Sequence, residues 1–107
     1  MNPKEREEAI IRSYRQDEEM MILVFAQWCV NHGLDPEELY LRAYPDQGAN
    51  PALQHALSLT VPKEEAGVLE DDTVLSVIGL FGNEDLAFVV TEEIDRRRAR
   101  RASSNNR

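Results

Sequence analysis

The fold is decided by the apolar run Met20-Met21-Ile22-Leu23-Val24-Phe25-Ala26. A helix that is apolar on every side is typical of one enclosed by neighbouring elements. No glycine or proline occurs from Lys4 to His32, and acid–base pairs four residues apart favour helix along this segment. We therefore predict a long N-terminal helix whose second half forms the centre of the core.

The length of this helix poses a problem of space. About 28 helical residues would span roughly 42 Å, whereas a globule of this chain length is roughly 34 Å wide. Either the helix breaks near Asp17, a plausible N-cap, or its end projects and packs on another copy. The second solution predicts a homodimer formed through residues 4–30. The candidate self-association residues, which lie near one helical face, are Ile10, Tyr14, Met21, Phe25 and Trp28.

An N-cap residue followed by proline marks the start of each of two further helices. Gly33 ends the first helix, and Asp35-Pro36-Glu37-Glu38 reads as the start of a second helix that stops before Pro45. Asn50-Pro51 repeats the signal for a short third helix that ends before Pro62. Residues 63–72 are expected to be a connector, with at most one helical turn.

The last third of the chain is where helix and strand compete. Residues 73–81 are rich in Val, Ile and Leu, but their apolar positions recur at helical spacing, and Asp71 or Asp72 can supply an N-cap. We predict an all-α fold, a small bundle of about four to five helices with a long N-terminal helix. The alternative is an α+β fold with a hairpin around residues 73–91. The final helix is expected to carry the ion pairs Glu92–Arg96 and Glu93–Arg97.

Charge divides the chain into two parts. Residues 1–95 hold 20 acids and 6 bases and carry −14, whereas residues 96–107 carry +6. We predict a single acidic helical domain over 1–95, followed by an arginine-rich helix extension and a disordered tail from about Ala102. The candidate partner-binding residues of the extension are Arg96, Arg97, Arg98, Arg100 and Arg101. Such a segment suits nucleic acid or an acidic protein, and it also suits a plain helix C-terminus.

The sequence offers little that indicates catalysis. Cys29 and His32 are three residues apart, but two ligands do not make a zinc site, and His55 has no evident partner. The paired acids fall mostly at predicted helix starts. Because glycine-loop, nucleophile-elbow and metalloprotease motifs are missing from the sequence, we expect no catalytic residue, metal or cofactor. An enzyme would need a site built from scattered residues such as His32 and His55.

The remaining features bear on location. A lone cysteine fits a reducing compartment, the N-terminus has no apolar signal-peptide core, and the apolar run is too short to span a bilayer. We expect a cytoplasmic protein without a membrane partner.

The function predicted from the sequence as a whole is a non-catalytic helical interaction or regulatory module that self-associates and binds an unknown protein partner. The alternative is a nucleic-acid-associated protein that binds through the arginine segment.

Overall fold

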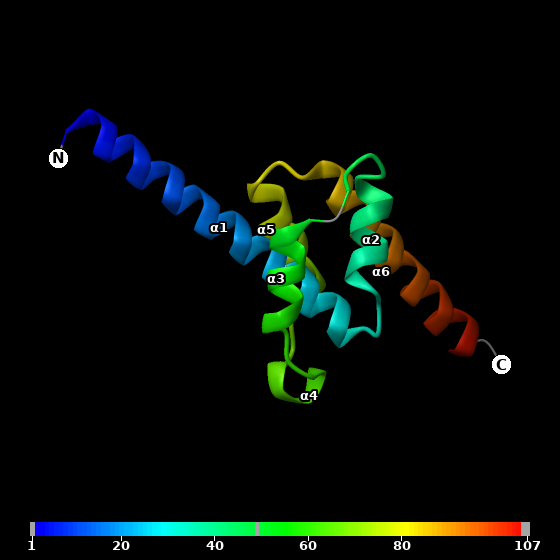
Figure 1. Ribbon diagram of the computed structural model, residues 1–107. Coiled ribbons are helices and arrows are strands. Elements are labelled where there is room, and N and C mark those ends of the chain that lie inside the picture. The colour runs from blue at the N-terminus through cyan, green and yellow to red at the C-terminus, as the bar shows by residue number, and fades with distance from the viewer. Residues whose placement is uncertain (1, 49, 106–107) are drawn as a thin grey trace.

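The computed structural model describes residues 2–48 and 50–105, and the side chains of these residues apart from 11–15, 104 and 105. These residues form helices and no strand (Figure 1). The helices are α1 (Pro3–Asn31), α2 (Pro36–Ala43), α3 (Pro51–Leu59), α4 (Lys63–Ala66), α5 (Asp71–Leu80) and α6 (Glu84–Asn105). The predicted all-α class is confirmed.

Two details of that prediction were wrong. The alternative hairpin around residues 73–91 does not form, because α5 and α6 occupy this segment with a break at Gly82. Gly82 has a positive φ of 67°, the conformation that ends helices at glycine. The described part of the chain contains six helices rather than four to five. The connector contributes α4, a single turn that ends at Gly67.

Helix α1 is continuous through Asp17, so the break considered at that position does not occur. It begins at Asn2, whose side-chain oxygen accepts a hydrogen bond of 2.8 Å from the backbone N–H of Glu5, and Pro3 follows the cap. Its first part, residues 3–15, is here called the arm. The arm points away from the other helices in Figure 1, and the molecule measures 67 × 32 × 24 Å along its principal axes. The side chains of residues 2–10 and 16–20 are all exposed.

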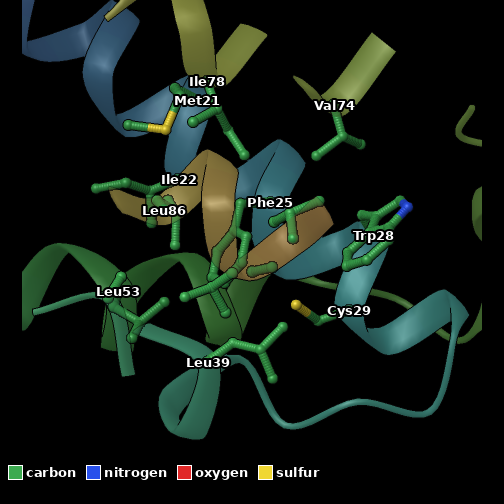
Figure 2. Packing of buried hydrophobic residues seen from close by; sticks show 14 of the residues in the cluster. Met21, Ile22, Phe25, Trp28, Cys29, Leu39, Leu53, Val74, Ile78 and Leu86 are labelled. Carbon is green, nitrogen blue, oxygen red and sulfur yellow. The ribbon is translucent and has the colours of Figure 1, made fainter. Parts of the chain in front are cut away.

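The second half of α1 is the centre of the core, as its all-round apolar sequence predicted. Helices α2, α3, α4 and α5 contact α1, and α6 packs against α2 and α5. Figure 2 shows Phe25 in the middle of this cluster, among side chains from several helices. The largest side chains that are fully buried are Trp28, Phe25, Leu39, Ile78, Leu86, Val74 and Val90. Burying each such side chain is worth about 1.5 to 3 kcal/mol, so this cluster fixes the arrangement of the helices.

The predicted caps orient the shorter helices. An Asp35 oxygen accepts a hydrogen bond of 3.0 Å from the Glu37 N–H, and an Asn50 oxygen accepts from Ala52 and Leu53. Helix α5 differs from its prediction, because it follows Glu70 and has no side-chain cap bond. Helix α6 includes residues 96–105, and thus extends beyond Ala102, where the tail was expected to begin. The end of that tail, residues 106–107, lies outside the described residues.

Candidate partner-binding surfaces

Two of the five candidate arginines are used inside the fold. The Arg97 guanidinium donates a hydrogen bond to Asp71 at the start of α5, and it lies 3.0 Å from Nδ1 of His32 at the end of α1. Arg96 donates to Glu93 at 2.9 Å. The predicted pairs Glu92–Arg96 and Glu93–Arg97 are replaced by these contacts, because Arg97 reaches across to another helix.

Asp71 is the hub of the first polar cluster. The Trp28 indole N–H donates a hydrogen bond of 3.0 Å to one Asp71 oxygen, and Arg97 donates to the other. Partial burial by itself would raise the pKa of Asp71, but these two hydrogen bonds outweigh it and lower that pKa below its ordinary value. Asp71 therefore stays ionised and ties α1, α5 and α6 together.

His32 lies against this cluster. Its ring is tilted over the Trp28 ring, with 4.9 Å between the centroids, and its Nε2 lies 3.8 Å from Asp71. Burial and the neighbouring Arg97 charge lower the pKa of His32, although Asp71 opposes them. The imidazole is thus held in its neutral form beside an arginine, an arrangement that suits a structural contact.

Glu93 is the hub of a second cluster, between α2 and α6. Its side chain is buried, and one of its oxygens accepts hydrogen bonds of 2.6 Å from Arg42 and 2.9 Å from Arg96. Arg42 also reaches Glu92 at 3.3 Å. The buried carboxylate is compensated by two cations, which is the condition under which such a group is tolerated.

The other three candidate arginines are at the exposed end of α6. Arg98, Arg100 and Arg101 all have exposed side chains and lie outside the ion pairs described above. They form the accessible part of the basic segment. The structure therefore divides the five arginines into Arg97, which links α6 to α1 and α5, Arg96, which pairs with Glu93 within α6, and three that face solvent.

The candidate chemical groups are placed apart from one another. Cys29 is buried in the core, and its burial raises the pKa of the thiol far above its ordinary value, which disfavours the thiolate form. His55 is exposed on α3, whereas His32 belongs to the Asp71 cluster. In the described part of the chain, no group of three or more His, Cys, Asp or Glu residues could hold a metal ion.

A pocket with a volume of about 550 Å³ opens beside α2. Its walls carry Asp35, Glu37 and Glu38 together with Tyr40 and Tyr44. Both tyrosine hydroxyls are engaged. Tyr40 accepts a hydrogen bond of 2.9 Å from Asn50, and Tyr44 donates one of 2.9 Å to Asn83. The first contact ties α2 to the start of α3, and the second ties the end of α2 to the turn between α5 and α6.

An apolar groove runs along α1 between α3 and α4. It consists of two adjoining pockets of about 250 and 300 Å³, which share Met20, Leu23 and Leu59. Four large apolar side chains in it are exposed to solvent: Met20 by 60%, Leu59 by 52%, Val61 by 38% and Val68 by 89%. A cluster of exposed apolar side chains in one groove is typical of a protein-interaction site.

The five predicted self-association residues do not form one surface. Met21, Phe25 and Trp28 are buried inside the single chain, where they pack in the core. Ile10 is 62% exposed on the arm, and the side chain of Tyr14 lies outside the described residues. Sequence reasoning missed the groove, because Leu59, Val61 and Val68 come from segments expected to be a short helix and its connector.

Comparison with known proteins gives the family. The YxiS family model matches residues 2–95. The chain belongs to the YxiS family. It is similar to the uncharacterised protein YxiS of Bacillus subtilis (strain 168), with 52% identity over 99 residues that cover 92% of this chain and 99% of that relative. No solved structure was found to match the chain. Among the described residues, no helix is long and apolar enough to cross a membrane.

Proposed function

We propose that this member of the YxiS family is a non-catalytic protein-interaction module that self-associates through α1. The observation that carries the proposal is the apolar groove along α1, together with the arm that extends from the same helix. The groove exposes Met20, Leu59 and Val68, and the arm exposes Ile10. Apolar side chains gathered in this way are stabilised when a partner covers them.

The helical conformation of the arm supports the same proposal. It is formed by only the first 13 residues of α1, and isolated helices of about 12 to 15 residues are marginal in water. Tertiary packing on an apolar face normally supplies most of the stability of a helix. The described arm side chains are exposed in the single chain, so a partner that packs on the arm would supply this stability.

The non-catalytic part of the proposal rests on the polar groups. The thiol of Cys29 is enclosed in the core, His32 is held by Trp28 and Arg97, and the buried carboxylate Glu93 is neutralised by two arginines. The candidate catalytic residues Cys29 and His32 thus have structural roles, and His55 is exposed on a different helix. This arrangement supports a binding function over an enzymatic one.

The proposal is tested by measuring the molar mass of the purified protein by light scattering across the micromolar range. We expect a mass that rises toward twice the 12.2 kDa of the chain as the concentration increases. Sedimentation velocity on the same samples separates a change of mass from the effect of the elongated shape. A mass that stays at that of one chain at every concentration would overturn self-association.

A second candidate function is nucleic-acid binding by the exposed end of α6. It is favoured by Arg98, Arg100 and Arg101, which are exposed cations on a single projecting helix end. The test is fluorescence anisotropy of labelled duplex DNA and single-stranded RNA with the wild type and the triple Arg→Gln variant at these positions. Binding through three cations would weaken with a log–log salt slope of about −2.7 for duplex DNA and about −2.1 for a single strand, and the variant would lose this binding. No binding at low salt would eliminate this candidate.

A further inference from the structure

We propose that the self-associated form is a reciprocal dimer in which the arm of each copy lies in the apolar groove of the other. This inference rests on the proposed self-association and names both surfaces that make it. The occupant of the groove is thus a second copy of this chain. The arm cannot fill the groove of its own chain, because both belong to one continuous helix.

The arm is short enough to lie within the groove. The groove follows α1 from Gln16 to Asn31, and the arm covers residues 3–15. At a rise of 1.5 Å per residue, these segments are about 23 Å and about 18 Å long. A two-fold axis crossing α1 between them, near Gln16, places each arm antiparallel along the other groove. The same operation satisfies both copies at once, as a closed isologous dimer requires.

The face of α1 that lines the groove continues into the arm. Met20, Leu23, Val24, Gln27 and Asn31 line the groove at steps of three and four residues. The same helical period leads back through Gln16, a groove residue, to Ala9 in the arm. Ala9 is small, which allows two helices to approach closely, and Ile10 beside it supplies an exposed apolar side chain.

Charge also favours this occupant. The arm contains four of the six bases of residues 1–95, namely Lys4, Arg6, Arg12 and Arg15, against three acids, and carries +1. Residues 16–95 hold the other 17 acids and two bases, and carry −15. The antiparallel arrangement brings Lys4 and Arg6 to the end of the groove near α4, which carries Glu64 and Glu65. The positively charged arm of one copy thus meets the acidic residues 16–95 of the other copy.

The test uses three substitutions at exposed apolar positions. Ile10→Glu changes the arm, Val68→Glu changes the groove, and Leu80→Glu is the matched control on α5, where Leu80 is 82% exposed compared with 89% for Val68. Light scattering over a concentration series gives the dissociation constant of each dimer. We expect Ile10→Glu and Val68→Glu each to weaken dimerisation at least tenfold, or 1.4 kcal/mol, and Leu80→Glu to leave it unchanged. Circular dichroism at low concentration checks that each variant is folded.

Mixing the two disruptive variants distinguishes a reciprocal exchange from other dimers. In the mixture, the wild-type arm of the Val68→Glu chain can enter the wild-type groove of the Ile10→Glu chain. We expect the mixture to associate more tightly than either variant alone, because the mixed dimer keeps one of its two arm-in-groove contacts intact. A wild type that dimerises while Ile10→Glu dimerises equally well, or a mixture that gains nothing, would overturn the arm-in-groove arrangement. A monomeric wild type would instead overturn the proposed function itself.

Discussion

Asp71 shows how a single side chain can hold three helices. It accepts hydrogen bonds from Trp28 on α1 and from Arg97 on α6 while it lies in the first turn of α5. Both Asp71 and Arg97 have side chains that are about one-fifth exposed, at 21% and 20%, so their attraction is only partly screened by water. The contact is therefore stronger than an ordinary surface ion pair.

We expect Asp71→Asn to lower the free energy of unfolding by about 1 to 3 kcal/mol, because Arg97 loses its charged acceptor in a partly buried position. The measurement is urea unfolding followed by tryptophan fluorescence and circular dichroism. Asp72→Asn is the control, since Asp72 is exposed in the same first turn and has the same favourable position relative to the helix dipole. Equal losses for the two variants would assign the effect to the dipole and contradict the cluster.

His32 makes the stability of the protein depend on pH. The pKa of His32 is lowered in the folded chain by burial and by Arg97, so the unfolded chain binds more protons in this range. The free energy of unfolding should therefore fall as the pH drops through the ordinary histidine value of about 6.5, and level off below the folded pKa. Urea midpoints at pH 5 to 8 measure this slope. His32→Gln should remove its share of the slope, and an unchanged slope would contradict this assignment.

Most of these side-chain contacts could not be predicted from the sequence. Asp71 or Asp72 was expected to cap α5, because a helix start is a local pattern that neighbouring residues reveal. Its actual partners, Trp28 and Arg97, are 43 and 26 residues away, and only the packing of three helices brings them together. The pair Glu93–Arg97 failed for the same reason, because Arg97 binds the distant Asp71. Arg96 binds Glu93, three residues away on the same helix, in place of Glu92.

At the scale of elements, α6 combines a structural first part with an exposed end. Arg96 and Arg97 bind Glu93 and Asp71, whereas Arg98 and Arg100 are exposed beyond them. We expect the double variant Arg96→Gln with Arg97→Gln to lose about 1 to 3 kcal/mol of stability, since Asp71 loses the Arg97 cation and Glu93 keeps only Arg42 of its two cations. Arg98→Gln with Arg100→Gln should stay within about 0.5 kcal/mol of the wild type.

Thermal and urea unfolding of the two double variants measure this division. The variants remove the same number of charges from the same helix, so a general effect of net charge is matched between them. Similar losses in both would mean that charge at the helix C-terminus, and not the specific ion pairs, stabilises α6.

Helix positions were more predictable than side-chain partners. The caps at Asp35 and Asn50 depend on residues within one turn, and they form as expected. The choice of helix for α5 was correct because Val74 and Ile78, four residues apart, are both fully buried on one face. The break considered near Asp17 did not occur, since nothing in the local sequence obliges a helix of good formers to stop when space runs out.

At the scale of the whole molecule, the 67 Å long axis arises because α1 is longer than the core it crosses. The half from Met21 onward is covered by other helices, while the described arm side chains are exposed. Backbone hydrogen bonds in such an arm open easily, because few buried contacts hold it. If the arm is covered only in the dimer, its stability depends on protein concentration by mass action.

Hydrogen–deuterium exchange at several protein concentrations tests this coupling directly. Amides of residues 7–15 should exchange quickly in dilute solution and become protected as the dimer forms, by a factor that follows the measured fraction of dimer. Amides of residues 25–31 lie in the core half of α1 and should be protected at every concentration, which gives an internal control within one helix. In the Val68→Glu variant, the arm should stay unprotected even in concentrated solution. Arm protection that is independent of concentration would mean that the helix is stable alone and that the partner's groove does not cover it.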